Sequence, residues 1–144
     1  MARYVTTIQS TLPVAEAFAY MAEFSNAQHW DPSVETATRT TTEPVETGAG
    51  FDLVVRFAGR KVPMHYSVVS YAEPRLVVLE ALQPTFVSRD TITVAPDGEG
   101  SSVHYDALLE FKGAAGRVLD PLLQLIFNRT GDKAAGGMRT ALNP

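Results

Sequence analysis

The stretch GAGFDLVVRFAGRKVPMHYSVVSYAEPRLVVLEA, residues 48–81, decides the fold. It is rich in Val, Leu and aromatic residues, and the turn signals Gly59-Arg60 and Glu73-Pro74 divide it. Runs of this composition between short turns predict β-strands joined as hairpins. In the first run every second residue is apolar, which places four large side chains on one face: Phe51, Leu53, Val55 and Phe57. We therefore expect a sheet with one covered face and one wet face.

The same texture extends in both directions, from Ser33 to Phe111. It is divided by further turn signals: Glu43-Pro44, Gly48-Ala49-Gly50, Gln83-Pro84 and Pro96-Asp97-Gly98. Connections this short predict about six consecutive strands, and hence an antiparallel meander rather than parallel βαβ units. The Thr-, Val- and Ile-rich run from Arg3 to Ser10 predicts one more strand ahead of them.

Between this first strand and the meander, the pattern becomes helical. Pro13 opens VAEAFAYMAEF, in which apolar residues recur at helical spacing, and a second short helical turn ends at Asp31-Pro32. The only tryptophan, Trp30, directly precedes that stop. A tryptophan at such a junction either packs two elements together or lies at the rim of a site. Asp31 is interpreted as a cap or turn residue beside Pro32.

The C-terminal segment predicts one long helix. Asp120-Pro121 offers an N-cap followed by proline at the first helical position, after Gly113 and Gly116 have ended the last strand. A helix from Asp120 to Asn143 is roughly 35 Å long, enough to cross a sheet. Its first turns are apolar on more than one side, which fits burial, a cavity wall or a partner surface. Gly131 and Gly136-Gly137 weaken it, so we expect it to bend over contents of different size.

Taken together, the chain resembles the START/Bet v 1-like (SRPBCC) superfamily, in its bacterial polyketide cyclase/dehydrase and lipid-transport branch. Beside the stretch quoted first, three motifs carry the resemblance: PVAEAFAYMAEFSNAQHWDPSV (13–34), DTITVAPDGEGSSVHYDALLEFKG (90–113) and GRVLDPLLQLIFNR (116–129). The resemblance places Trp30 where the small helices meet one end of the C-terminal helix, so we expect Trp30 chiefly to pack these elements together, with ligand contact as the alternative. The resemblance covers essentially the whole chain. It implies a single α+β domain, residues 1–144, with the helix-grip fold: about seven strands in a curved antiparallel sheet around a long C-terminal helix, and two small helices after the first strand.

Composition excludes several classes of function. The 144 residues carry a formal charge of −4 without a local Lys/Arg cluster, so nucleic acid and anionic membranes are not expected partners. With no cysteine, disulfides, thiolate nucleophiles and Cys-based zinc sites are excluded. The three histidines lack a metal-binding spacing, and we expect neither metal nor cofactor. The start MARYVTTIQS has no signal-peptide core, and no apolar run approaches the roughly 18 residues that span a bilayer, so we expect a cytoplasmic protein.

Several polar residues share the apolar phase of their strands, and they predict a binding site. They are Tyr66, Ser88, Asp90 and Tyr105. If that phase faces inward, they line a pocket bounded by Phe51, Leu53, Val55, Phe57, Leu123, Phe127 and Met138, with Trp30 at its rim. A carboxyl in such a pocket has a raised pKa, which suits proton transfer or a hydrogen-bond anchor.

The catalytic residues stay unknown, with Asp90 and Glu80 as the candidates. Each has an alternative. Glu80 faces outward if Val77, Leu79 and Ala81 face inward, and Asp90 could instead pair with Arg89 or Arg56 at a sheet rim.

The resemblance implies an apolar cavity that binds lipids, sterols, polyketides or hormone-like molecules, and a minority of family members are enzymes. Our first hypothesis is therefore binding or carrying of a small hydrophobic ligand of lipid, polyketide or aromatic type. The second is a cofactor-independent cyclase or dehydrase that uses general acid–base residues. The third is a protein–protein interaction module built on the apolar start of the last helix, which would allow a homodimer.

Overall fold

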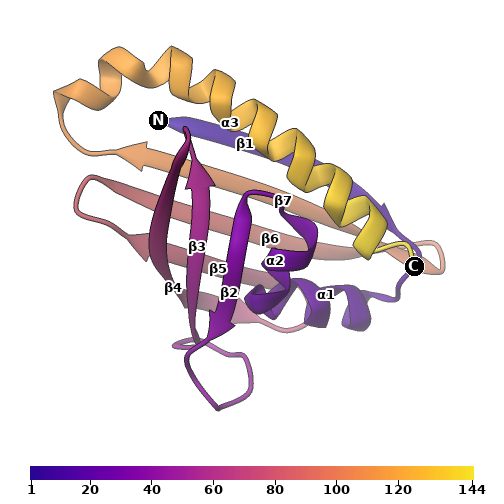
Figure 1. Ribbon diagram of the computed structural model, residues 1–144. Helices are drawn as coiled ribbons and strands as arrows, with labels where there is room; N and C mark the ends of the chain where they lie inside the picture. Colours follow the sequence, from indigo (N-terminus) through magenta and orange to yellow (C-terminus); the bar gives the residue numbers. More distant parts are fainter.

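The computed structural model describes the backbone of residues 1–144 and the side chains of residues 1–113 and 120–144. Seven strands form one antiparallel sheet in the order β1-β7-β6-β5-β4-β3-β2 (Figure 1). Their bounds are β1 Ala2–Ser10, β2 Val34–Arg39, β3 Gly50–Phe57, β4 Arg60–Ala72, β5 Leu76–Leu82, β6 Phe86–Asp97 and β7 Gly100–Phe111. Strands β2 to β7 are a meander, and β1 joins its end by pairing with β7. The predicted seven-stranded antiparallel sheet is confirmed.

The helices lie at the two places where they were expected. Between β1 and β2 come α1 (Val14–Ala22), the short 3₁₀ helix η1 (Phe24–Asn26) and α2 (Ala27–Trp30). The long helix α3 (Ala114–Ala141) follows β7 and runs across the curled sheet beside β1, and its far end lies near the small helices (Figure 1). This is the helix-grip arrangement. No helix in the part of the chain that the structure describes is long and apolar enough to cross a membrane.

The predicted start of the long helix was wrong. The helix begins at Ala114 and not near Asp120, and Pro121 lies inside it. Gly113, with φ 87°, turns the chain out of β7 directly into the helix. Pro121 removes one backbone donor near the start of a 28-residue helix, and the remaining turns continue past it. Asp120 binds the N-terminal ammonium at 2.6 Å instead of capping. The side chains of the GRVL motif at 116–119 lie outside the described residues.

Two glycines of α3 bring the helix close to its neighbours. A methyl group at Gly137 would overlap the carbonyl oxygen of Trp30, and one at Gly131 would overlap the ring of Tyr4. At Gly136, by contrast, a methyl group would meet open space. Gly131 and Gly137 therefore allow α3 to pack directly on β1 and on the end of α2. The bend that we predicted from these glycines stays a prediction.

Candidate ligand-binding site

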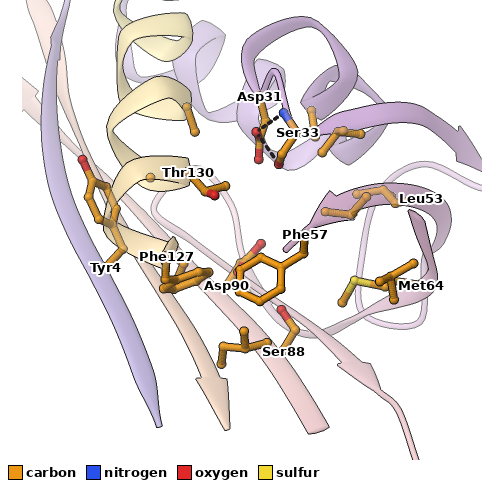
Figure 2. A pocket seen from close by; sticks show the side chains of 18 of the residues that line it. Tyr4, Asp31, Ser33, Leu53, Phe57, Met64, Ser88, Asp90, Phe127 and Thr130 are labelled. Carbon is orange, nitrogen blue, oxygen red and sulfur yellow. Dashed lines mark hydrogen bonds between the residues drawn. The ribbon is translucent and has the colours of Figure 1, made fainter. Parts of the chain in front are cut away.

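A pocket of about 410 Å³ lies between the inner face of the sheet and α3. Figure 2 shows side chains from β1, β3, β4, β6, α3 and the segment after α2 pointing into it. All but one of the predicted ligand-binding residues line it. The apolar ones are Leu53, Val55, Phe57, Leu123, Phe127, Met138 and Trp30, and the polar ones are Tyr66, Ser88, Asp90 and Tyr105.

Phe51 is the exception, since it does not line the pocket. It is fully buried and packs edge-on against Phe24, with 6.3 Å between ring centroids. Phe51 shares the face of Leu53, but it lies two residues before Leu53, near the start of β3, where η1 covers the sheet. The alternation of a strand predicts which face a residue is on; it does not predict whether a helix fills the space above it.

The two ends of the pocket differ. At one end the lining residues are exposed or half-buried, and they come from the adjoining ends of β3 and β4, the β5–β6 turn and the first half of α3: Phe57, Arg60, Thr85, Leu123 and Phe127. At the other end the lining is buried: Phe24, Ala27, Trp30, Ala134 and Met138. We call these the open end and the closed end of the pocket.

Asp90 is the most deeply buried carboxyl of the pocket, with 5% of its surface exposed. The hydroxyl of Tyr105 on β7 donates a hydrogen bond to Asp90 Oδ2 at 2.8 Å. Burial raises the pKa of Asp90 to about 7; the hydrogen bond from Tyr105 opposes this shift, and the negative charge of Asp31 adds to it. The alternative pairing with arginine is not present, because Arg89 binds Glu80 and Arg56 binds Glu35.

Two phenols stand beside this carboxyl. Tyr66 on β4 and Ser88 on β6 share a hydrogen bond of 2.7 Å between their hydroxyl oxygens. Burial raises the pKa of Tyr66 and of Tyr105 well above the ordinary tyrosine value, and the charge of Asp90 raises both further. Both phenols therefore keep their protons at neutral pH and can donate hydrogen bonds.

The structure adds a second carboxyl, Asp31, that the sequence did not predict as a site residue. Asp31 follows α2 and lines the pocket together with Ser33 (Figure 2). Its Oδ1 accepts hydrogen bonds from the Ser33 backbone N–H at 2.9 Å and from Ser33 Oγ at 2.7 Å. Burial raises the pKa of Asp31, and the two hydrogen bonds from Ser33 oppose the shift. A turn residue has no strand phase, so nothing in the sequence showed where this side chain points.

Trp30 both packs and lines the pocket. It is the last residue of α2, and 1% of its surface is exposed. Its ring meets those of Tyr105 and Phe24 edge-on, at centroid distances of 5.5 and 6.2 Å. Its indole N–H finds no acceptor among the described residues. Trp30 thus closes one end of the pocket between α2, α3 and the sheet.

Glu80 lies outside the pocket, as in the outward alternative. Val77, Leu79 and Ala81 are fully buried, whereas Glu80 accepts a hydrogen bond from Arg89 Nε at 2.9 Å on the other face of the sheet. Strand β5 is apolar in both phases, so its sequence alone could not decide between them. Glu80 is therefore removed from the catalytic candidates.

The described residues contain no group of three or more His, Cys, Asp or Glu side chains that could hold a metal ion. His65 and His104 face solvent, where they hydrogen-bond to Asp52 and Thr7.

Comparison with known proteins identifies the family and similar folds. The family model described as polyketide cyclase / dehydrase and lipid transport matches residues 1–143. The fold is similar to that of a START superfamily protein from Mycobacterium smegmatis, with 14% identity, a TM-score of 0.80, and coverage of 99% of this chain and 97% of that one. It is also similar to the Zhui aromatase/cyclase of a Streptomyces species, with 12% identity, a TM-score of 0.78, and coverage of 97% and 92%.

A third similar structure is ginseng major latex-like protein 151 from Panax ginseng, with 12% identity, a TM-score of 0.71, and coverage of 99% and 98%. Identities this low show a shared fold alone. No curated protein matches the chain. The match over residues 1–143 nevertheless decides the family: the chain belongs to the polyketide cyclase/dehydrase and lipid-transport family, with the helix-grip fold of the START/Bet v 1 superfamily.

Proposed function

We propose that this protein binds a small hydrophobic ligand, of lipid, polyketide or aromatic type, in the pocket between the sheet and α3. The observation that carries the proposal is the pocket itself: about 410 Å³, mostly apolar in its walls, open at one end and closed at the other. Sites for small molecules are typically concave and apolar with a few convergent polar groups, and this pocket has that composition. The family and the fold are consistent with this function.

The walls and the polar groups make different contributions. Burial of ligand against Leu53, Phe57 and Phe127 supplies affinity at roughly 25 cal/mol per Å² of apolar surface removed from water. The hydroxyls of Tyr66 and Tyr105 and the carboxyl of Asp90 orient the ligand, because a buried polar group left unmatched costs about 1–3 kcal/mol. A ligand that carries a hydroxyl or carbonyl group fits this arrangement.

One observation favours a second function, a cofactor-independent cyclase or dehydrase. Asp90 lies in the pocket with a pKa of about 7, where a carboxyl can both take up and release a proton near neutral pH. Replacing Asp90 by Asn distinguishes the two functions. A carrier keeps its affinity within about tenfold, while an enzyme that uses Asp90 for proton transfer loses a factor of about 10² or more in rate.

The remaining predictions concern partners and location. Leu122 and Leu125 are exposed on the first half of α3, where a protein interaction or a homodimer would bury them. Light scattering of the purified protein measures this directly, with a dimer mass as the supporting result and a monomer mass as the contrary one. A cytoplasmic location stays a prediction from the sequence.

Ligand binding itself is tested with N-phenyl-1-naphthylamine, an uncharged probe that fluoresces in apolar surroundings. We expect saturable binding to the wild-type protein. Ala134→Phe places a ring in the pocket and should weaken binding by about tenfold or more, since the ring takes the volume of the probe. Ala19→Phe, at an exposed position of α1, is the matched control and should bind like wild type. Equal binding by both variants would contradict the proposal.

A further inference from the structure

The carboxyl groups of the pocket have unused acceptor capacity. Both hydrogen bonds to Asp31 fall on Oδ1, and the one to Asp90 falls on Oδ2. No described group donates to Asp31 Oδ2 or to Asp90 Oδ1. Neither oxygen is sealed inside the protein, because the only buried side-chain atoms without a partner among the described residues are Trp30 Nε1 and Arg39 Nε. Both free oxygens are therefore open to the pocket that their side chains line.

The pocket also lacks a positive charge near these groups. Among its described lining residues, the only basic one is Arg60, which is exposed at the open end. Two arginines on the strands that carry Tyr4 and Asp90 face outward and have partners there: Arg3 on β1 pairs with Asp106, and Arg89 on β6 pairs with Glu80. The described interior thus holds two carboxyl groups with no protein cation to neutralise them.

The two carboxyls flank an aromatic pair. Asp31 follows Trp30 directly in the chain, and the Trp30 ring lies 5.5 Å from that of Tyr105. Tyr105 in turn donates to Asp90. Figure 2 shows Asp31 and Asp90 entering the same pocket from the segment after α2 and from β6. The negative charge of Asp31 acts on Asp90, so a cation in this part of the pocket would be attracted by both carboxyl groups.

We propose that the pocket takes a hydrophobic amine, with its ammonium group between Asp31 and Asp90 and its apolar body against Leu53, Phe57 and Phe127. This proposal rests on the proposed ligand-binding function and names the ligand class. An ammonium carries only donors, and it satisfies the two free carboxylate oxygens while it neutralises their charge. A hydroxyl offers a single donor. A carboxylate brings a third negative charge into a site that has no buried cation to pair with it.

Three probes that share a naphthyl body and differ in the head group test this class: 2-(1-naphthyl)ethylamine, 2-(1-naphthyl)ethanol and 1-naphthylacetate. Isothermal titration calorimetry at pH 8 measures each affinity under conditions in which Asp90, with a pKa of about 7, is mostly ionised. We expect the amine to bind about tenfold or more tightly than the alcohol, and the carboxylate to bind most weakly, because charge-assisted hydrogen bonds are stronger than neutral ones.

Variants assign the preference to the two carboxyls. Asp31→Asn and Asp90→Asn keep an acceptor for Ser33 and for Tyr105, so thermal unfolding should show folded proteins. Each should lose most of the preference for the amine, measured as the ratio of the amine and alcohol affinities in the same variant, because an amide carries no charge. Asp52→Asn removes the same charge from the outer face of β3, where Asp52 pairs with His65, and should change neither affinity.

The outcomes separate the two proposals. If the alcohol binds as tightly as the amine to the wild-type protein, the amine class is overturned while the hydrophobic-ligand function stands. If the amine preference is present but survives in both pocket variants, the placement between Asp31 and Asp90 is overturned. If none of the three probes binds and N-phenyl-1-naphthylamine does not bind either, both proposals fail.

Discussion

The two ends of α3 face the same pocket, but they are built differently. Toward the C-terminus, Met138 and Leu142 are fully buried and Gly137 lies against the Trp30 backbone. Toward the N-terminus, Leu122 and Leu125 expose 56% and 51% of their surface, and the residues that face the pocket are only half-buried. From this difference we infer that one end of α3 stabilises the fold and propose that the other end admits the ligand. Substitutions at the closed end should therefore change stability, and those at the open end should change binding.

The largest effect is expected from Asp90, a buried residue of the pocket. The pKa of Asp90 rises on folding from an ordinary value of 3.8 to about 7, so the folded protein binds a proton at pH values where the unfolded chain has lost it. Its contribution to stability is therefore most favourable below about pH 4, falls as the pH rises to about 7, and is constant above. At about 1.36 kcal/mol per pH unit, the full loss is about 4 kcal/mol.

Asp90→Asn should remove this loss. Urea unfolding of wild type and variant at pH 4.5 and pH 8 measures it: the variant should gain stability relative to wild type on going to pH 8. A difference between the two proteins that does not change with pH would show that Asp90 has an ordinary pKa, and would remove the electrostatic basis of the acid–base alternative.

Trp30 provides the next largest effect. Trp30→Ala should lower the free energy of unfolding by about 3 kcal/mol, because it deletes a fully buried ring between α2, α3 and the sheet. Trp30→Phe should cost less, since it keeps an aromatic ring and removes an indole N–H that has no described acceptor. Denaturant titration of both variants measures these two costs. A cost below about 1 kcal/mol for Trp30→Ala, together with lost probe binding, would make Trp30 a ligand contact rather than a structural one.

Two adjacent glycines give a matched pair at the same end of α3. Gly137→Ala should destabilise by about 2 kcal/mol, because its methyl group would overlap the Trp30 carbonyl oxygen and the helix would have to shift. Gly136→Ala meets open space and should stabilise by about 0.5–1 kcal/mol, through the higher helix propensity of alanine. Thermal unfolding of the two variants and of the wild-type protein measures both effects. Equal and favourable effects at the two positions would contradict the close packing of α3 on α2.

The smallest effect on stability belongs to the open end. Phe127 is half-buried, and its ring meets that of Phe57 edge-on, with 6.3 Å between the ring centroids. Phe127→Ala should lower the free energy of unfolding by about 1 kcal/mol or less. The same change should weaken binding of N-phenyl-1-naphthylamine severalfold, since it removes apolar wall area. If Phe127→Ala unfolds the protein as readily as Trp30→Ala does, the division of α3 into a stabilising end and a binding end is wrong.

Much of this arrangement was predictable from the sequence, because it is set by alternation. Residues such as Tyr66, Asp90 and Tyr105 lie in long strands where every second side chain faces inward, and all three line the pocket. Where alternation gives no information, the sequence misses a pocket residue or leaves its orientation open. Asp31 lies in a turn, and Glu80 in a strand that is apolar in both phases.

The position of a residue along its strand or helix is the other feature that the sequence pattern does not predict. Phe51 and Leu53 share a face, yet only Leu53 lines the pocket, because Phe24 of η1 packs over Phe51. The start of α3 depended on Gly113 rather than on the stronger local signal Asp120-Pro121. Tertiary packing overrides local propensity at such points.

The central claim, that a hydrophobic ligand occupies the pocket under α3, is tested most directly by methyl NMR. Methyl resonances of Leu53, Met64 and Met138 report on the pocket, and those of Val69 and Leu82 report on exposed surface. On titration with N-phenyl-1-naphthylamine, the account predicts saturable shifts of the first three resonances with the last two unchanged. Shifts confined to Val69, Leu82 or the exposed leucines of α3, with Leu53, Met64 and Met138 unmoved, would contradict it.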